Sequence, residues 1–346
     1  MRLRRAALAE ASHGPVLIVG PSWVGDMVMA QSLLRLLAAR HPHVSLDVLA
    51  PGWSLPILAR MSEVREAIEM PAGHGELRLG ERRRLGRALR EHGYAQAIVL
   101  PRSLKAALVP WFARIPRRTG FRGEHRYGLV NDMRPFDAAV LDQTVKRFAA
   151  LGLEPGEPLP DVLPRPGLRV DTGRQAQAIA RLRLDPAADP IAFMPGAEYG
   201  PAKCWPLEYY AELAARLTGR GHAVWVFGSA KDAAAARAIA AAAPVQDLCG
   251  RTSLEEAIDL LAACRAGVTN DSGLMHVAAA VGLPVAALYG SSSPAFTPPL
   301  TDRAVVHYLG LDCSPCFERE CPLGHFRCLR EIMPEEVLKS LDELAA

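Results

Sequence analysis

The sequence predicts an α/β protein built from two doubly wound, Rossmann-like domains. Short apolar runs alternate with amphipathic stretches, which is the pattern of βαβ units around a parallel sheet. The alternation stops at a proline-rich stretch, residues 153–167, and then starts again. The chain of 346 residues is also longer than one hydrophobic core usually supports.

The first half contains three predicted strands and two predicted helices. We expect buried strands at the apolar runs, and helices where apolar residues recur on one face, as Leu33, Leu34 and Leu37 do. In chain order the expected elements are strand 16–19, helix 26–40, strand 44–50, helix 76–92 and strand 96–100.

The proline-rich stretch has five prolines in residues 153–167, which is typical of a linker. The pattern beyond it predicts a second sheet with its helices. Ser253 with Glu256 three residues later has the form of a capping box at a helix start. The expected elements are strand 191–194, helix 206–220, strand 223–227, helix 231–243, helix 253–264, strand 267–269, helix 273–281 and strand 285–289.

Charge is distributed unevenly between the halves. Residues 1–165 carry 24 basic and 16 acidic side chains, a balance of +8, whereas residues 166–346 carry 16 and 21, a balance of −5. A basic half predicts an anionic partner for the first domain, although a drift of surface charge would give the same numbers.

We expect a cytoplasmic protein with reduced thiols. The longest apolar stretch, Val277 to Tyr289, is broken by glycine and proline and is too short to span a bilayer. The basic N-terminus has no continuous apolar core before Glu10, so it does not have the form of a secretory signal. The seven cysteines are odd in number and unevenly placed, which does not indicate a disulfide framework.

Gly20-Pro-Ser-Trp-Val-Gly25-Asp26 follows the first predicted strand. The glycines have the spacing of a phosphate-binding P-loop, but Asp26 stands where that loop has lysine, so a nucleoside triphosphatase is disfavoured. Asp26 is either the N-cap of the helix or a general base at the edge of the sheet.

Two loops of the second half carry a further group of polar residues. Residues 269–276 leave a strand and enter a helix, and the backbone N–H groups of Ser272 and Gly273 at that helix start would suit a diphosphate. Residues 195–206 connect another strand to a helix, and Lys203 could neutralise a phosphate there. The alternatives are a capped helix with a polar first turn and a solvated loop lysine.

These motifs resemble those of the ADP-heptose:lipopolysaccharide heptosyltransferases. The resemblance runs from about Val16 to the end of the chain and leaves residues 1–14 as an extension that we expect to be flexible. The stretches that carry it are VGPSWVGDMVMAQSL, RRTGFRGEHRYGLVND, MPGAEYGPAKCWP, VFGSAKD, LCGRTSLEEAIDLL, TNDSGLMHVAAA and CSPCFERECPLGHFRCL.

The resemblance implies the GT-B fold, in which two Rossmann-like domains face a central cleft. It implies an acceptor-binding domain over residues 15–165 and a donor-binding domain over residues 166–346, the latter with the cysteine-containing tail. Asp26 resembles the catalytic base of the family. The implied donor-binding residues are Glu198, Tyr199, Lys203, Gly228, Ser229, Asp271, Ser272, Gly273 and His276; relatives have hydroxyl residues in the places of Glu198 and Tyr199.

The implied reaction is inverting transfer of a heptose from ADP-L-glycero-D-manno-heptose to the lipid A-linked inner core of lipopolysaccharide. Asp26 would accept the proton of the attacking hydroxyl, and Lys203 with the helix start at Ser272 would stabilise the departing ADP. No D-x-D sequence occurs in the chain, so we expect neither a metal nor another cofactor.

Residues 102–134 hold eight basic and two acidic residues, a balance of +6 on the predicted acceptor domain. Arginine forks bind phosphates and carboxylates, so this segment is predicted to contact the anionic core or the inner-membrane surface, and no nucleic acid. A solvated basic face is the alternative. The predicted acceptor-binding residues are Gly25, Lys105, Arg117, Arg118, Arg122 and Arg126.

The tail contains Cys313, Cys316, Cys321 and Cys328, whose spacing matches no standard zinc finger. We expect reduced structural thiols there, with a metal site as the lesser alternative. The loop at 197–206 and this tail favour the second heptosyltransferase step over the first and third. A nucleotide-sugar epimerase of the same fold, or a non-catalytic binding module, are the remaining hypotheses.

Overall fold

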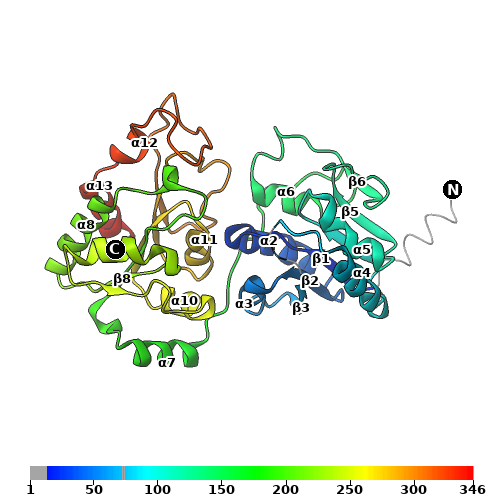
Figure 1. Cartoon of the computed structure of the whole chain (residues 1–346), viewed down its shortest axis with the longest axis horizontal. Coiled ribbons are helices and arrows are strands. Elements are labelled where there is room, and N and C mark those ends of the chain that lie inside the picture. Colours follow the sequence, from blue (N-terminus) through cyan, green and yellow to red (C-terminus); the bar gives the residue numbers. More distant parts are fainter. Residues whose placement is uncertain (1–13, 72, 74, 346) are drawn as a thin grey trace. The chain divides into compact units, whose positions relative to one another are not determined.

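The computed structural model describes residues 14–71, 73 and 75–345 (Figure 1). They form two compact units, divided in the chain between Pro166 and Gly167. The extension expected to be flexible lies outside the described residues except for Gly14. No helix of the described part is long and apolar enough to cross a membrane.

The first unit contains a six-stranded, fully parallel sheet with the order β3-β2-β1-β4-β5-β6. Because the strand order reverses between β1 and β4, the sheet is doubly wound, as predicted. Its strands are β1 (Val16–Val19), β2 (Leu46–Pro51), β3 (Val64–Met70), β4 (Gln96–Val99), β5 (Arg117–Phe121) and β6 (Asp132–Arg134). Its helices are α2 (Val24–Arg40), α3 (Leu55–Leu58), α4 (Leu79–Ala88), α5 (Leu108–Phe112) and α6 (Thr144–Ala150).

Three strands of this sheet were not predicted, and each carries charged residues. β3 and β6 are the two edges of the sheet, where charged side chains protect exposed strands from pairing with other chains. β5 begins with Arg117 and Arg118, and only its second half is buried. The apolar runs that predict β1, β2 and β4 are therefore absent from these strands.

Two helix boundaries in the first unit differ from the prediction. Helix α2 begins at Val24, so Asp26 is in its first turn and is not its N-cap. The stretch predicted as one helix over 76–92 contains α4 and a separate 3-10 turn, Leu89–His92.

The second unit repeats this plan with the order β12-β11-β10-β7-β8-β9, again fully parallel. Its strands are β7 (Ile191–Met194), β8 (Val224–Val226), β9 (Gln246–Asp247), β10 (Ala266–Asn270), β11 (Val285–Leu288) and β12 (Ala304–His307). Its helices are α7 (Thr172–Leu182), α8 (Leu207–Gly219), α9 (Ala233–Ala240), α10 (Leu254–Leu261), α11 (Gly273–Ala280), α12 (Arg327–Arg330) and α13 (Pro334–Ala345).

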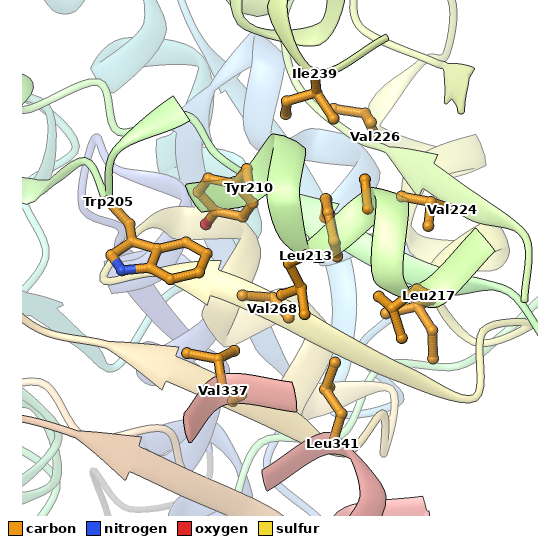
Figure 2. Close-up of a cluster of buried hydrophobic side chains, with 14 of the residues drawn as sticks. Trp205, Tyr210, Leu213, Leu217, Val224, Val226, Ile239, Val268, Val337 and Leu341 are labelled. Atoms are coloured by element: carbon orange, nitrogen blue, oxygen red, sulfur yellow. The ribbon is translucent and has the colours of Figure 1, made fainter. Parts of the chain in front are cut away.

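The core of the second unit lies between its sheet and helix α8. Figure 2 shows Tyr210, Leu213 and Leu217 of α8 among side chains of the strands and of α13. The indole of Trp205 is 1% exposed and donates a hydrogen bond to the carbonyl oxygen of Ile332, so it joins the start of α8 to the tail.

The predicted capping box is present at the start of α10. The backbone N–H of Glu256 donates to the hydroxyl of Ser253 (3.2 Å), and the Glu256 carboxylate accepts from the Ser253 N–H (2.9 Å). The local sequence was sufficient to predict this helix start, because Ser253 and Glu256 are within one helical turn of each other.

The proline-rich stretch has no regular secondary structure, but its first part is packed. Leu159 and Leu163 contact a small buried cluster formed by Leu36, Ala149 and Leu153. Arg40 at the end of α2 pairs with Glu157 at 2.5 Å. These contacts hold the start of the linker against the first unit.

Candidate active site

In each unit the charged residues predicted to act on the substrates follow strands at the point where the strand order reverses. The order changes between β1 and β4 in the first unit and between β7 and β10 in the second. Doubly wound sheets bind ligands outside the carboxyl ends of the strands at such points. Asp26 follows β1, Lys203 follows β7 and Asp271 follows β10.

Asp26 lines a cavity of about 830 Å³ in the first unit. The side chain is half-buried and belongs to the first turn of α2, where the partial positive charge of a helix N-terminus favours a carboxylate. No side chain caps this helix start. Asp26 therefore presents a carboxylate to a cavity large enough for a sugar.

The same cavity brings together basic and aromatic side chains from separate loops. Lys105, which the sequence predicts as an acceptor-binding residue, lines this cavity, and so do Arg78 and Arg102, which the sequence reasoning did not assign. Trp23 and Trp53, also on its wall, are 44% and 43% exposed. The sequence contains a signal for Arg102, because this charged residue comes three positions after the buried strand β4.

Three of the predicted acceptor-binding arginines form ion pairs or hydrogen bonds within the first unit. Arg117 pairs with Asp132 and Glu154, each at 3.0 Å. Arg118 donates to backbone carbonyl groups, including that of Leu129 at 2.6 Å.

Arg126 is 1% exposed and donates to the carbonyl oxygens of Pro101 (2.6 Å) and Phe121 (2.5 Å). In the folded chain, neighbouring backbone and carboxylate oxygens accept hydrogen bonds from these three guanidinium groups, which leaves fewer N–H groups for forked acceptor contacts. Their acceptor-binding role stays a prediction.

Arg122 differs from them because its side chain is exposed. It lines a second open cavity with Arg102 and Glu124, and its guanidinium lies 6.0 Å from the centre of the Tyr127 ring. Gly25 is buried in α2 and has only its backbone to offer. An acceptor role for Arg122, Lys105 and Gly25 stays a prediction.

In the second unit, Lys203 and Asp271 form an ion pair across the reversal point. The Lys203 Nζ lies 2.5 Å from Asp271 Oδ2, and the two side chains are 18% and 5% exposed. The hydroxyl of Thr297 donates to the other carboxylate oxygen at 3.4 Å. Asp271 thus holds the ammonium group in place and leaves it partly accessible.

Asn270 fixes the loop that carries Lys203. Its side-chain amide donates to the Pro195 carbonyl (2.6 Å), and its side-chain oxygen accepts from the backbone N–H of Trp205 (3.0 Å). Both ends of the loop 195–206 are therefore attached to the last residue of β10. Asn270 is fully buried, which makes these bonds strong constraints.

Three buried serine hydroxyls, one at the start of α11 and two just after β11, have no hydrogen-bond partner in the described part of the chain. Ser272 is its N-cap, but the Ser272 hydroxyl makes no cap bond and is buried. The hydroxyls of Ser291 and Ser292, just after β11, are also buried without a partner among the described residues. Unsatisfied buried hydroxyls at a helix N-terminus favour an anionic ligand. Sequence reasoning missed the second pair, although the run Ser291 to Ser293 follows a buried strand.

His276 is buried within α11 and is 4% exposed. Burial lowers the pKa of His276 to about 4, against the opposing effect of the Asp271 carboxylate. The imidazole is therefore neutral near pH 7 and adds no charge to the site.

The remaining predicted donor residues form the rim of this site. Glu198 is exposed and pairs with Lys231 at 2.5 Å. The centre of the Tyr199 ring lies 5.2 Å from the Lys203 ammonium and 5.3 Å from the guanidinium of Arg319. The role of Arg319 was not predicted, because it comes from the tail.

Gly228 and Ser229 form the turn that leads to α9. The side chain of Asp232 accepts from the Ser229 N–H at 2.8 Å. A Cβ atom on Gly228 would approach the Asp232 Cβ to 2.7 Å, and one on Gly196 would approach its carboxylate to 2.3 Å. Glycine is required at both positions for the two loops to pack around Asp232.

The four tail cysteines line one small cavity beside Ala202 and Ser291. All seven cysteines are free thiols. In the described part of the chain, no group of three or more His, Cys, Asp and Glu side chains is placed to hold a metal ion. The absence of a metal remains a prediction. The cysteine segment supports the Lys203 loop, since the Ala202 N–H donates to the Arg319 carbonyl at 3.0 Å.

The described site can be compared with known proteins. Residues 82–327 match the family described as glycosyltransferase family 9 (heptosyltransferase). Lipopolysaccharide heptosyltransferase 2 of Escherichia coli (strain K12) is 49% identical over 95% of this chain and 98% of its own length. Lipooligosaccharide heptosyltransferase 2 of Haemophilus influenzae is 46% identical over 96% and 99%.

Lipopolysaccharide heptosyltransferase 1 of Pseudomonas aeruginosa is less similar, at 31% identity over 93% of this chain and 92% of the relative. Among solved structures, that of E. coli ADP-heptose lipopolysaccharide heptosyltransferase II has a TM-score of 0.87 and 47% identity, and covers 96% of this chain and 98% of that one. A UDP-GlcNAc 2-epimerase from Methanocaldococcus jannaschii, with a TM-score of 0.53, 10% identity and coverage of 96% and 92%, shares the fold alone.

Proposed function

The chain belongs to glycosyltransferase family 9, the heptosyltransferase family, and on this premise we propose that it transfers a heptose from ADP-L-glycero-D-manno-heptose to the heptosyl-Kdo-lipid A inner core of lipopolysaccharide. The observation that carries the proposal is the near-full-length similarity to heptosyltransferase 2 proteins. The lower identity to a heptosyltransferase 1 supports the second transfer step over the first.

Asp26 is the proposed general base. An acceptor hydroxyl attacks the anomeric carbon while its proton passes to the Asp26 carboxylate, and the bond from that carbon to the ADP oxygen breaks with its electron pair. Attack from the face opposite the ADP inverts the anomeric centre. The position of Asp26 on a cavity with Lys105 and Arg102 supports this role.

The donor diphosphate is proposed to bind at the start of α11. Lys203, held by Asp271, would neutralise one phosphate, while the N–H groups at Ser272 and Gly273 face the other oxygens. The unpartnered hydroxyls of Ser272 and Ser291 support an oxygen-rich ligand here. These fixed positive groups stabilise the charge that grows on the leaving ADP.

The acceptor is proposed to lie in the Asp26 cavity. Arg78, Arg102 and Lys105 supply positive charge for phosphate or carboxylate groups of the core, and Trp53 offers a flat apolar surface to a sugar ring. Arg122 extends this surface. Because the acceptor is linked to lipid A, we also propose peripheral contact with the inner membrane.

One transfer assay, run with and without core acceptors of different length, separates the alternatives. Purified protein is incubated with ADP-heptose and a core acceptor that carries one heptose, and the product is analysed by mass and linkage. The expected product has one added heptose and free ADP. Transfer only to an acceptor without heptose, or only to a longer core, would instead indicate the first or third step. Epimerised nucleotide sugar without acceptor would indicate an epimerase.

A further inference from the structure

A groove between α4 and α5 combines positive charge with exposed apolar side chains. The two helices pack against each other at one side of the first unit (Figure 1). The groove, of about 740 Å³, is lined by Arg83, Arg87 and Arg90 from α4 and the following turn, and by Trp111 and Arg114 from α5 and its end. We call it the arginine groove.

The arginines of the groove form no ion pair with a carboxylate of the described residues. Within residues 14–71, 73 and 75–345, no carboxylate pairs with Arg83, Arg87 or Arg114. Arg90 donates to the Phe112 carbonyl at 3.0 Å, and its pKa is lowered by desolvation and by the charges of Arg114 and Arg87. Four cations so close together repel one another, which favours an anionic partner.

The apolar residues of the groove identify the kind of partner. Trp111 is 44% exposed and Leu79 is 50% exposed, at the groove wall. An indole beside arginine side chains is the combination found at membrane interfaces, where the ring lies at headgroup level and the cations meet lipid phosphates. A soluble polyanion would use the arginines but would gain little from Trp111 and Leu79.

The position of α4 relates this groove to the Asp26 cavity. Arg78 and Arg82, at the start of α4, line the cavity, whereas Leu79 and Arg83 line the groove. A surface that contacts the groove therefore lies within one helical turn of the cavity wall.

We propose that the arginine groove docks on the surface of an anionic bilayer, with phospholipid phosphates between the guanidinium groups and Trp111 among the headgroups. Lipid binding itself does not depend on the proposed function; only the benefit of presenting a lipid-linked acceptor to the Asp26 cavity rests on it.

The test is co-sedimentation of the full chain with vesicles. One set contains phosphatidylglycerol and phosphatidylethanolamine, and the other contains phosphatidylcholine alone. The wild type is expected to bind the anionic set and to lose binding as salt rises. Arg83→Gln/Arg87→Gln is expected to weaken partitioning about thirty-fold, which corresponds to about 1 kcal/mol for each lost charge.

The matched control is Arg237→Gln/Arg330→Gln. Both residues are exposed, have no ion pair in the described structure and belong to the second unit. This control removes the same charge and is expected to change partitioning less than two-fold. Trp111→Ala should weaken binding without changing its salt dependence, because it removes an apolar contact. Unchanged melting temperatures show that the variants fold.

Three results would overturn the proposal. Wild-type partitioning of the Arg83→Gln/Arg87→Gln variant would exclude the groove as the contact. Equal binding to heparin and to anionic vesicles, with no effect of Trp111→Ala, would indicate a soluble polyanion. A change of oligomeric state in the groove variants, measured by light scattering without vesicles, would indicate contact between copies of the chain. Failure of heptose transfer alone leaves each of these readouts intact.

Discussion

At the scale of single residues, the side chains proposed to accept the proton and to stabilise the leaving diphosphate have different surroundings. Asp26 lies on an open cavity at a helix start, so it is positioned to meet an acceptor hydroxyl. Lys203 is held by a carboxylate that is 5% exposed, so its ammonium group has a fixed place. Each arrangement leads to a separable prediction.

Asp26→Asn is expected to lower kcat by about 10² or more, because the amide cannot accept the proton. ADP affinity, measured by calorimetry, should be unchanged. Stability should fall by less than about 1 kcal/mol, the value of one carboxylate near a helix N-terminus. Wild-type turnover at saturating acceptor would exclude Asp26 as the base.

Lys203→Ala is expected to raise the activation free energy derived from kcat/KM by about 2 to 4 kcal/mol and to weaken ADP binding, because the leaving diphosphate loses its fixed cation. Asp271→Asn should act in the same direction but more weakly, since the amide oxygen still accepts from Lys203. Lys339→Ala is the control, because Lys339 is 79% exposed on α13. Unchanged ADP affinity together with unchanged turnover in Lys203→Ala would contradict the assignment.

The buried imidazole of His276 predicts a pH effect on stability. Its pKa is lowered to about 4 in the folded chain and is about 6.5 when unfolded. The unfolded state therefore binds the proton first, and stability is lost as pH falls from 6.5 towards 4. Between pH 7 and 5 the wild type should lose about 1 to 2 kcal/mol more than His276→Gln, measured by urea unfolding. Equal losses would mean that the fold does not lower the pKa of His276.

At the scale of elements, arginine side chains attach strands to loops in the first unit. Arg126 connects the end of β5 to the loop after β4 through two carbonyl groups. The guanidinium of Arg117 similarly joins β5 to β6 and to the linker segment through Asp132 and Glu154. The basic segment therefore contributes to the architecture of the sheet edge as well as to surface charge.

Arg126→Ala is expected to destabilise the first unit by about 2 to 4 kcal/mol, because two buried carbonyl groups lose their donor. Arg122→Ala should change stability by less than about 0.5 kcal/mol and should raise the acceptor KM. Urea unfolding and steady-state kinetics on the two variants distinguish the roles. A normal unfolding curve for Arg126→Ala would show that its buried bonds are dispensable.

At the scale of the whole molecule, both units follow one plan: a parallel six-stranded sheet whose order reverses once, with proposed site residues at the reversal. The predicted fold class, with two Rossmann-like units as in the GT-B glycosyltransferases, is confirmed.

Chelation tests whether the complete enzyme needs a divalent ion. We expect transfer in excess EDTA to stay within about two-fold of the untreated rate, because Lys203 and the start of α11 supply the positive charge at the diphosphate. Activity lost in EDTA and restored by Mg²⁺ or Mn²⁺ would contradict this. Restoration by Zn²⁺ alone would indicate a metal at the tail cysteines.

An element can be predicted from the sequence when the interactions that form it are between residues close together in the chain. Continuous apolar runs fixed β1, β4 and β7, and a capping box fixed the start of α10, because these signals lie within a few residues. The charged strands β3 and β6 have no such apolar run. Each is an edge of the sheet with a neighbouring strand on one side only, and edge strands commonly carry charged side chains. These two strands form by pairing with β2 and β5, which lie elsewhere in the chain, so their local sequence does not predict them.

The sequence by itself determined where the proposed site residues stand in the chain: Asp26, Lys203 and Asp271 each follow a predictable buried strand. Only the tertiary structure decided their partners and accessibility. It joined Lys203 to Asp271 across 68 residues, buried Arg126 and placed Arg102 on the wall of the cavity that Asp26 also lines. The physical reason is that charge is a property of the residue, whereas burial and hydrogen bonding depend on neighbours that are distant in the chain.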